Sequence, residues 1–266
     1  MKYPIEKVNH LKEILKSYGS VLVAFSGGAD STLLLSVACE VLGSRVLAVT
    51  ADSEVYPPGE AEEASSLARA FSCRHIVIKT KGLAGAAFKG NPPDRCYYCK
   101  KELYTILLCM TREHGMSCVV DGVNAEDDAR DRPGIRAAAE MGVRSPLREA
   151  GLNKHEIRAY SRELGLCTAG KPASPCLASR FPYGMEITRE GLEMVHRAEL
   201  YLKTLDLPHF RVRHHGDLAR IEVPASHLGY MVEKATEVVP ALKETGYTYV
   251  ALDLLGYRAG SMNEVL

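Results

Sequence analysis

The sequence predicts an α/β fold, with a doubly wound parallel sheet followed by a small α+β domain. Through the first two thirds of the chain, short apolar runs alternate with segments of helical length. Such alternation is typical of parallel βαβ units, which bury the sheet between two layers of helices. Beyond residue 184 the order of strands and helices changes. We therefore expect a main domain over residues 1–184 and a smaller domain over residues 185–266.

The main domain contains four short runs rich in Val, Ile and Leu. We expect parallel strands at residues 21–25, 45–50, 75–78 and 117–121. Helices are expected at residues 31–42, 59–71, 97–114, near 135–141 and at 154–164, with a short strand around Val143. Parallel strands end at one edge of their sheet, and open α/β sheets bind ligands at that edge. The loops that follow the strands are therefore the candidate binding segments.

The smaller domain is expected to mix helices and strands. Its elements are a helix at residues 187–205, strands at 210–213 and 218–223, a helix from Ser226 and a strand at 247–252. A segment of about 80 residues can just bury a core of its own. We therefore expect this part of the chain to form a separate small sheet with helices against it.

Composition excludes several classes of protein. Hydrophobic residues make up 46% and charged residues 25%, as in ordinary globular proteins. Lys plus Arg and Asp plus Glu both total 33, so no global field draws the chain to nucleic acid or to a membrane surface. The N-terminal segment does not resemble a signal peptide, and no apolar stretch has membrane-spanning length. We expect a cytoplasmic protein whose eight cysteines are thiols or ligands rather than disulfides.

A Gly-rich turn between the first strand and the next helix predicts a phosphate site. It reads Ser26-Gly27-Gly28-Ala29-Asp30-Ser31. Glycines let backbone amides approach an anion closely, and the N-terminus of the helix faces the negative charge. Ser26 and Ser31 add hydroxyl donors, and Asp30 is suited to hold magnesium against the phosphates. No Gly-Lys-Ser/Thr follows, so the turn is not a Walker loop.

This motif resembles the PP-loop ATP pyrophosphatase superfamily. The resemblance implies an adenine nucleotide alpha hydrolase-like fold, and a reaction that splits ATP into AMP and pyrophosphate while adenylating a substrate oxygen. Such a step depends on positioning and charge neutralisation. The superfamily places nucleotide-contacting backbone in the loop after the fourth strand, which here contains Gly122. We also expect Lys171 to meet the pyrophosphate, and a solvated loop lysine is the alternative.

Three cysteines lie in segments suited to metal ligands. Cys96 and Cys99 form a C-x-x-C pair at the start of a predicted helix, where the thiolate form is favoured. Cys176 lies in a polar loop rich in Pro and Gly, where it is poorly placed as core filler. No second C-x-x-C follows, so a four-cysteine zinc site would need scattered partners. Inert buried thiols are expected at the other positions, Cys39, Cys73, Cys109, Cys118 and Cys167.

Five motifs together resemble the LarE family of pyridinium-3,5-biscarboxylic acid mononucleotide sulfurtransferases. In order along nearly the whole chain, they are SGGADS, NPPDRCYYCK, DRPGIR, KPASPCLASRFPYG and GYRAGSMNE. That family helps to build the nickel-pincer nucleotide cofactor of lactate racemase. The resemblance implies that the chain adenylates a pyridinium carboxylate and then delivers sulfur from a donor to form a thiocarboxylate. It also implies a homo-oligomer, a hexamer.

The family uses two sources of sulfur. In one, the cysteine that matches Cys176 attacks the acyl-adenylate, gives up its own sulfur and becomes dehydroalanine. In the other, three cysteines bind a [4Fe-4S] cluster whose fourth iron carries an exchangeable sulfide. Sacrificial members need one cysteine, whereas this chain also has Cys96 and Cys99. We therefore favour a cluster on Cys96, Cys99 and Cys176, since three thiolates leave one iron open, with a sacrificial Cys176 as the alternative.

Three arginines are predicted to bind the substrate. Arg180 follows Cys176 closely and is expected to meet the substrate phosphate or the acyl-adenylate. Arg211 and Arg213 alternate on a predicted strand, so they share one face and are suited to clamp a phosphate. A solvated strand edge is the alternative. The neighbouring pair His214-His215 is expected to lie at the surface rather than to bind a metal.

Three other functions remain open at this point. A PP-loop tRNA thiolase would use similar cysteines, but the neutral net charge and the lack of a separate basic domain argue against nucleic acid as a partner. A non-catalytic ATP-binding regulator would keep the fold without the reaction, and Asp30 beside the glycines disfavours it. A redox or zinc-only protein would use the C-x-x-C pair alone.

Overall fold

The computed structural model describes residues 4–128, 133–172, 174–258 and 260–265. They divide into two compact units. The first unit contains the residues up to 53 together with 58–81 and 94–174, and the second contains 54–57, 82–93 and the residues from 175 onward. None of the described helices is long and apolar enough to cross a membrane. The domain boundary at residue 184 stays a prediction.

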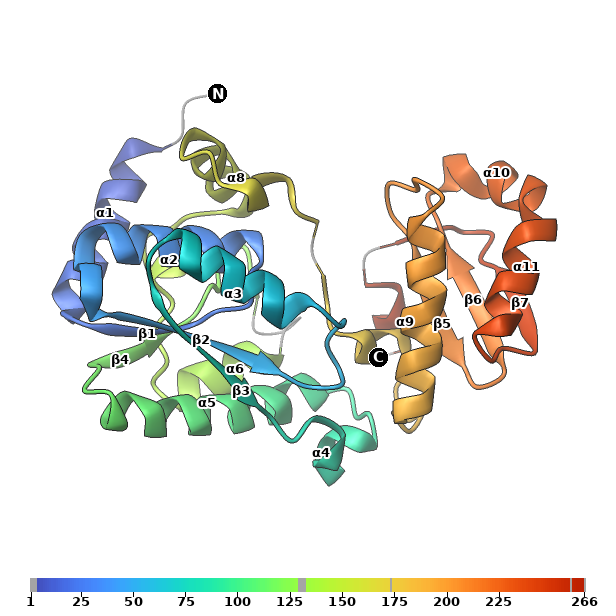
Figure 1. Ribbon diagram of the computed structural model, residues 1–266, viewed down its shortest axis with the longest axis horizontal. Helices are drawn as coiled ribbons and strands as arrows, with labels where there is room; N and C mark the ends of the chain where they lie inside the picture. The colour runs from blue at the N-terminus through green and yellow to red at the C-terminus, as the bar shows by residue number, and fades with distance from the viewer. Residues whose placement is uncertain (1–3, 129–132, 173, 259, 266) are drawn as a thin grey trace. The chain divides into compact units, whose positions relative to one another are not determined.

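The first unit is built on a parallel sheet, as the sequence predicts (Figure 1). Its strands are β1 (Val21–Ala24), β2 (Val46–Asp52), β3 (Arg74–Lys79) and β4 (Cys118–Val120). Their order is β3-β2-β1-β4, and every neighbouring pair is parallel. The chain thus moves outward from β1 through β2 to β3, and returns to the other side of β1 as β4. This reversal makes a topological switch point between β1 and β4, where doubly wound sheets bind ligands.

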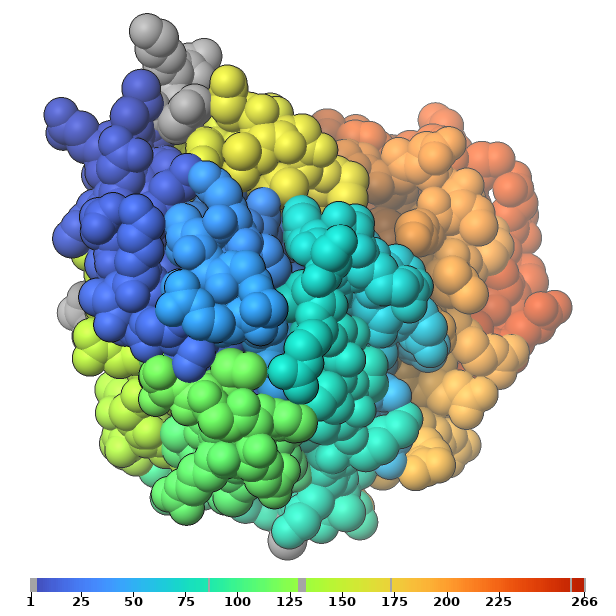
Figure 2. Space-filling model, turned by 60° about the vertical axis from the view of Figure 1, so that its left-hand side comes forward, coloured from blue at the N-terminus to red at the C-terminus, as the bar shows by residue number. Residues whose placement is uncertain are grey.

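Helices bury both faces of this sheet. Val21 and Val23 of β1 pack into one apolar core and Leu22 into another, because successive side chains of a strand point to opposite faces. The first core is shared with α1 (Ile5–Tyr18), α2 (Ala29–Leu42), α3 (Glu60–Ala70) and α8 (Lys154–Glu163). The second is shared with α5 (Arg95–Glu113) and α6 (Pro133–Glu140). In the space-filling view, α1 and α2 lie side by side in blue (Figure 2).

The second unit carries a small sheet of its own. Its strands are β5 (Arg211–His215), β6 (Leu218–Glu222) and β7 (Tyr249–Leu252), in the order β5-β6-β7. β5 and β6 are antiparallel, whereas β6 and β7 are parallel. The helices of this unit are α4 (Ala86–Lys89), α9 (Arg189–Lys203), α10 (Leu228–Glu233) and α11 (Ala235–Glu244). Val212, Ile221 and Leu242 lie in its core.

Two predicted elements take a different form. The strand expected around Val143 is reduced to a single bridge between Val120 and Arg144. The helix expected from Ser226 is divided into α10 and α11, which are separated at Lys234. A further short helix, α7, spans Pro146–Glu149 in the first unit. Short 3-10 turns lie at Gly43–Arg45, Gly82–Ala84, Cys167–Gly170, Leu177–Arg180, Ala225–His227 and Ser261–Asn263.

Candidate active site

The Gly-rich turn of residues 26–31, predicted to bind phosphate and called the phosphate loop from here on, connects β1 to α2 at the switch point of the sheet. Gly27 has a φ of 69°, a left-handed conformation that side chains disfavour. A Cβ at Gly27 would also lie 3.4 Å from the Cβ of Ala64 on α3, so glycine lets the loop and α3 pack closely. Gly28 is extended, with a φ of −78° and a ψ of 167°. The backbone conformation therefore requires glycine at Gly27 but not at Gly28.

The two serines of the loop are joined to each other. Their hydroxyl oxygens, Ser26 Oγ and Ser31 Oγ, lie 3.0 Å apart, and Ser31 Oγ also donates to the Gly28 carbonyl at 3.2 Å. Ser31 is buried, whereas Ser26 is exposed at the surface of the loop. These bonds fix the curve of the loop, so that Ser26 is the hydroxyl open to a ligand.

Asp30, in the first turn of α2, is oriented by a residue from the loop after β4. The Nδ2 atom of Asn124 donates to Asp30 Oδ2 at 2.9 Å. Asn124 is fully buried. Its Oδ1 accepts a hydrogen bond from the backbone amide of Glu126 at 2.9 Å, and its own backbone amide donates to Asp127 Oδ2 at 3.2 Å. The asparagine is thus locked in place, and it holds a half-buried carboxylate at the N-terminus of α2.

Gly122 brings the loop after β4 against the phosphate loop. A Cβ at this position would lie 3.1 Å from the Ser31 amide nitrogen and 3.2 Å from Ser31 Cα, so only glycine fits without displacing the backbone. Asp121, just before it, accepts from Tyr104 Oη at 2.8 Å and from Ser145 Oγ at 2.7 Å. Asp121 therefore anchors this loop to α5 and to the start of α7.

Lys171, which the sequence predicts to meet the pyrophosphate, lies beside the loop of residues 26–31. Lys171 Nζ donates to the Gly27 carbonyl at 3.2 Å and lies 2.8 Å from Glu63 Oε1 of α3. The backbone of this segment is held by Arg158 of α8, whose guanidinium donates to the carbonyls of Ala169 and Lys171. An ammonium group thus stands beside the amides and hydroxyls of the loop, and Glu63 holds it there.

The C-x-x-C pair lies in the first turns of α5. Cys96 and Cys99 are both half-buried, and neither forms a disulfide. A spacing of three residues puts the two thiols on the same side of a helix. α6 packs close to them, since a Cβ at Gly134 would lie 3.6 Å from the Cys96 carbonyl oxygen. These two thiols belong to the first unit.

Cys176 belongs to the second unit, at the N-terminal end of the 3-10 turn Leu177–Arg180. Its thiol is half-buried. Arg180 donates from Nη1 to the carbonyls of Pro175 and Cys176, at 2.8 and 3.2 Å, and its Nε and Nη2 meet the two carboxylate oxygens of Glu199 at 2.9 and 2.8 Å. Arg180 therefore holds the backbone that presents Cys176.

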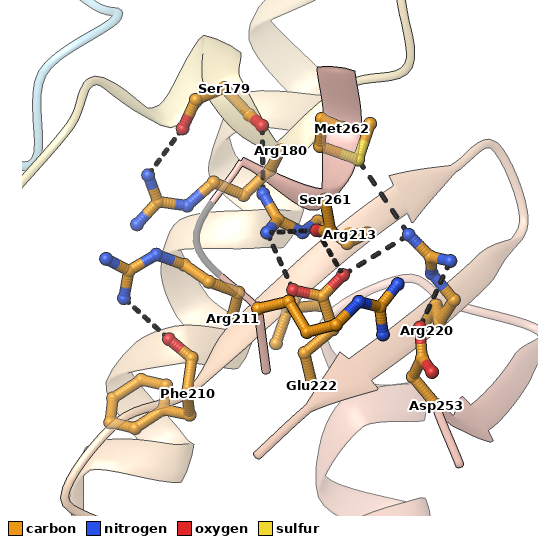
Figure 3. Close-up of polar contacts among 12 residues, drawn as sticks. Ser179, Arg180, Phe210, Arg211, Arg213, Arg220, Glu222, Asp253, Ser261 and Met262 are labelled. Carbon is orange, nitrogen blue, oxygen red and sulfur yellow. Dashed lines mark hydrogen bonds and ion pairs between the residues drawn. The ribbon is translucent and has the colours of Figure 1, made fainter. Parts of the chain in front are cut away.

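Arg213 is also engaged within the second unit (Figure 3). Its Nη2 lies 2.6 Å from Glu222 Oε2, and its Nη1 donates to the Ser179 carbonyl at 3.1 Å. Glu222 is fully buried and forms a second ion pair, in which its Oε1 lies 3.3 Å from Nη2 of Arg220. Paired buried charges of this kind hold elements together, and here they connect β5, β6 and the turn that follows Cys176.

Arg211 differs from its neighbour on the strand. Its guanidinium points to the same side as that of Arg180 in Figure 3, donates to the Phe210 carbonyl at 2.6 Å and lies 5.5 Å from the centre of the Tyr257 ring. Partial burial lowers the pKa of Arg211, and the positive charges of Arg180 and Arg213 lower it further. A bound anion would offset that repulsion. Of the three predicted arginines, Arg211 is the one best suited to receive a phosphate.

Two expectations from the sequence are wrong. His214 is buried rather than at the surface: its Nδ1 lies 3.1 Å from Tyr247 Oη, and its ring centre lies 4.6 Å from that of Phe181. Both faces of β5 are covered, so alternation does not expose this side chain. Conversely, Cys109 and Cys167 are exposed rather than buried.

No group of three or more His, Cys, Asp or Glu side chains suited to a metal ion occurs among the residues that the structure describes. Magnesium at Asp30 and the cluster on three cysteines therefore stay predictions. Of the motif residues quoted above, Asp131, Arg132, Ala173 and Ala259 lie outside the described part of the chain.

Four partners of the predicted site residues were not predicted from the sequence. They are Asn124 beside Asp30, Glu63 beside Lys171, Glu199 beside Arg180 and Glu222 beside Arg213. Asn124 is the one with a positional signal that could have identified it. It stands in the loop after β4, which is adjacent to β1 in the sheet.

Known proteins resemble the chain along most of its length, although no protein-family model matches it. It is 44% identical over 263 residues to an uncharacterized protein of Synechocystis sp., covering 98% of both chains. It is 42% identical over 253 residues to the pyridinium-3,5-bisthiocarboxylic acid mononucleotide synthase of Lactiplantibacillus plantarum, covering 95% of this chain and 92% of that protein. One of the subunits of the glutamine-hydrolysing GMP synthase of Thermoplasma acidophilum is 30% identical over 206 residues, which cover 71% of this chain and 64% of that polypeptide.

Proposed function

Because the chain belongs to the LarE family of sulfur-transferring synthases, we propose that it acts on pyridinium-3,5-biscarboxylic acid mononucleotide. It adenylates a carboxylate of this substrate with ATP, releases pyrophosphate and then converts the acyl-adenylate to a thiocarboxylate, for nickel-pincer cofactor synthesis. One observation carries the proposal. Asp30, Asn124 and Lys171 converge on the phosphate loop at the switch point of the sheet, in a chain that matches the synthase along almost its whole length.

In the adenylation step, a carboxylate oxygen of the substrate attacks the α-phosphorus of ATP, and the bond to the bridging oxygen of pyrophosphate breaks. The loop amides and the N-terminus of α2 receive the phosphates. Lys171 stands beside Gly27, where it can neutralise charge on the departing pyrophosphate. Asp30 would hold magnesium, which supplies further charge neutralisation. Its carboxylate fits that role, because it lies in the first turn of α2 and Asn124 fixes its direction.

For sulfur delivery we propose that Cys96, Cys99 and Cys176 hold a [4Fe-4S] cluster. The donor set fits in chemical type, since the thiols are half-buried and none is in a disulfide. Such a cluster supplies a sulfide at its open iron. Arg180 contributes by holding the backbone carbonyls around Cys176.

The alternative source of sulfur is Cys176 itself. Its thiolate attacks the acyl carbon and displaces AMP, which gives a thioester. Loss of the α-proton of Cys176 then breaks its Cβ–S bond, leaving a thiocarboxylate and a dehydroalanine. In this route the enzyme turns over once, whereas a cluster recharged by an external sulfur donor allows repeated turnover. The half-buried position of Cys176 is compatible with both routes.

Substrate binding is assigned to the arginines of the second unit. Arg211 is proposed to meet the substrate phosphate directly, because its guanidinium is partly desolvated beside two other cations. Arg180 and Arg213 contribute positive potential, while their hydrogen bonds go to Glu199 and Glu222. We further propose a cytoplasmic homo-oligomer, a hexamer as in the family.

The cysteine roles are tested by anaerobic purification, iron analysis and mass spectrometry of the protein after reaction with ATP, substrate and sulfide. We expect iron in the wild type, loss of iron and of repeated turnover in Cys96→Ala, Cys99→Ala and Cys176→Ala, and no change in Cys109→Ala, an exposed thiol on the same helix. Iron-free enzyme that loses the elements of hydrogen sulfide from Cys176 would establish the sacrificial route instead.

The arginine assignment is tested by substrate binding at saturating ATP. Arg211→Ala should weaken substrate binding about 10- to 100-fold, since a hydrogen bond to a charged group contributes about 1.5–3 kcal/mol. Arg211→Lys should restore only part of it, because an ammonium lacks the bidentate fork. The exposed Arg189 serves as the matched control. Unchanged affinity in Arg211→Ala would contradict the assignment.

A further inference from the structure

One face of the β5–β6 hairpin carries three guanidinium groups. Arg211 and Arg213 alternate on β5, so they share this face. Directly across on β6, Arg220 pairs with Arg213 and Glu222 pairs with Arg211. Like charges placed opposite one another destabilise a sheet. The Arg213–Arg220 pair is held by Glu222 and by Asp253, which lies 3.2 Å from Arg220, so the three cations meet only two carboxylates.

Three nitrogen atoms on this face have no hydrogen-bond partner among the described residues. They are Nε of Arg213, Nε of Arg220 and Nε2 of His215, and all three atoms are buried. The whole Arg213 residue is only 6% exposed. Buried polar groups in proteins are nearly always paired, and an unpaired one is costly. A guanidinium Nε–H group can only donate, so the group that would satisfy it is an acceptor.

The 3-10 turn Ser261–Asn263 lies against the same arginines. Figure 3 shows Ser261 reaching Arg213, and Met262 reaching Arg220. Ser261 Oγ accepts from Arg213 Nη2 at 3.2 Å, and Met262 Sδ lies 3.8 Å from Arg220 Nη2. A neutral hydroxyl and a thioether are weak acceptors for a guanidinium, whereas an oxyanion is a strong one. The turn therefore gives these two arginines partners that an anion can replace.

Few contacts hold this turn in place. Besides its contacts with the arginines, Ser261 Oγ donates to Glu222 Oε1 at 3.3 Å, and Asn263 Oδ1 accepts from Tyr183 Oη at 2.9 Å. None of the three residues of the turn belongs to the apolar core described for the second unit, and Asn263 is exposed. Segments with few buried apolar contacts open at a low cost in free energy. The turn can therefore leave the arginines without disturbing the core.

We propose that Arg213 and Arg220 form an oxyanion subsite, and that the turn Ser261–Asn263 is a lid that a bound oxyanion displaces. Oxygen atoms of the anion replace Ser261 Oγ and Met262 Sδ as acceptors. The ion pairs to Glu222 and Asp253 stay in place and keep the two guanidinium groups oriented. No covalent bond changes in this step.

The chemistry of the subsite suits a phosphate or a carboxylate group. In the proposed function both groups belong to one substrate, and the inference rests on that function only for the identity of this substrate. The lid lies in the motif GYRAGSMNE, to which the proposed reaction assigns no role. A lid that is closed without ligand lowers the apparent affinity by the fraction of molecules that are open. Ligands without a suitably placed oxyanion are therefore bound less well.

Equilibrium binding of inorganic phosphate to the full chain and to two variants tests the proposal. A chain that ends at Gly260 lacks the lid, and Asn263→Ala removes the bond to Tyr183 without touching the arginines. We expect phosphate to bind about tenfold more tightly to the shortened chain and about threefold more tightly to Asn263→Ala, because the closed lid competes less. Pyridine-3,5-dicarboxylate is the second probe, and it shows this gain instead if the subsite takes a carboxylate.

Three further measurements separate the subsite from other anion sites. Adding Arg220→Gln to either variant should abolish the gain, since neither Arg211 nor the phosphate loop is changed. Asn9→Ala, at an exposed asparagine of the first unit, is the matched control and should bind both probes as the wild type does. In the wild type, bound probe should speed the oxidation of Met262 by hydrogen peroxide at least about threefold as the lid opens, while the buried Met231 is unaffected.

Unchanged or weaker binding of both probes to the variants would overturn the proposal. So would a gain that survives Arg220→Gln, or oxidation of Met262 that bound probe does not speed. If the shortened chain fails to fold, Asn263→Ala decides the outcome. None of these measurements uses ATP cleavage, so a failure to form AMP and pyrophosphate would count against the proposed function and leave the subsite standing.

Discussion

At the scale of single residues, the direction of the Asp30 carboxylate is set by Asn124. The side-chain amide of Asn124 donates to one oxygen of the Asp30 carboxylate. Asn124 itself is held by the backbone amide of Glu126, which donates to its Oδ1, and by its own backbone amide, which donates to the Asp127 carboxylate. A metal-binding carboxylate held in one rotamer loses less freedom when the metal binds, which favours the bound state. In the proposed mechanism Asn124 is therefore a positioning residue for the ATP site, although it carries no charge.

The first prediction concerns this asparagine. Asn124→Asp keeps the acceptor for the Glu126 amide but replaces the donor to Asp30 with a like charge. We expect a fall of about 10- to 100-fold in the rate of pyrophosphate release, since a hydrogen bond to a charged group contributes about 1.5–3 kcal/mol. Asn124→Ala should fall less steeply. Replacement of the exposed Asn9 should have no effect, and an Asn124→Asp enzyme with the normal rate would rule out the positioning role.

The second prediction concerns the buried His214. Burial lowers its pKa, and the charge of His215 lowers it further, against the opposing effect of Asp217. The unfolded chain therefore binds a proton near pH 6.5 that the folded chain takes up only at lower pH. The contribution of His214 to stability is full above pH 6.5 and is lost as the pH falls below it. The slope is at most about 1.4 kcal/mol per pH unit for one proton.

Thermal unfolding at pH 7.5 and pH 5.5 measures this effect. His214→Gln keeps a polar partner for Tyr247 and should shrink the difference between the two pH values. His10→Gln, at an exposed site, should leave the difference as in the wild type. The burial-lowered pKa values of His75 and His215 predict that some acid sensitivity remains in the His214 variant. An undiminished difference in that variant would contradict the assignment.

At the scale of elements, the site depends on the close approach of two loops from neighbouring strands. β1 and β4 pair in parallel, so the loops that follow them leave the same edge of the sheet. Gly122 then fits against the backbone of Ser31. The spacing between these loops is what allows Asn124 to reach Asp30 across a sequence separation of 94 residues.

The third prediction tests that spacing. Gly122→Ala places a Cβ 3.1 Å from the Ser31 amide nitrogen, which pushes the two loops apart. We expect a loss of ATP affinity of at least about tenfold, and destabilisation of about 1–3 kcal/mol from overpacking. Gly170→Ala, where a Cβ meets nothing within 4 Å, is the matched control and should retain both. Equilibrium binding of ATP and denaturant unfolding check the two effects. Wild-type ATP affinity in Gly122→Ala would show that the contact is dispensable.

The elements that the sequence predicts well are those with strong local signals. The run Val21–Ala24 is apolar throughout because both faces of β1 are buried, and the glycines after it mark the turn. Lys171 was predicted to meet the pyrophosphate, and its Nζ lies 3.2 Å from the Gly27 carbonyl, while its role stays a prediction. The ion pairs of Arg180 and Arg213 were not predicted, since a buried partner depends on how distant strands and helices pack. His214 was misplaced for a related reason, because a strand covered on both faces shows no polar alternation.

At the scale of the whole molecule, the predicted functions are divided between two units. The phosphate loop, Lys171 and the C-x-x-C pair belong to the first, and Cys176 with the three arginines belongs to the second. Each unit has its own sheet and its own core. In the proposed reaction, adenylation is assigned to residues of the first unit and substrate binding to arginines of the second.

The measurement that tests this account most directly is product analysis of ATP cleavage in the presence of pyridinium-3,5-biscarboxylic acid mononucleotide. Phosphorus NMR or ion-exchange chromatography separates the products. We expect AMP and pyrophosphate in equal amounts, formed only when the mononucleotide is present, and reduced by at least about 100-fold in Asp30→Ala, where the carboxylate proposed to hold magnesium is removed. ADP and orthophosphate as products, or cleavage that does not depend on the mononucleotide, would contradict the account.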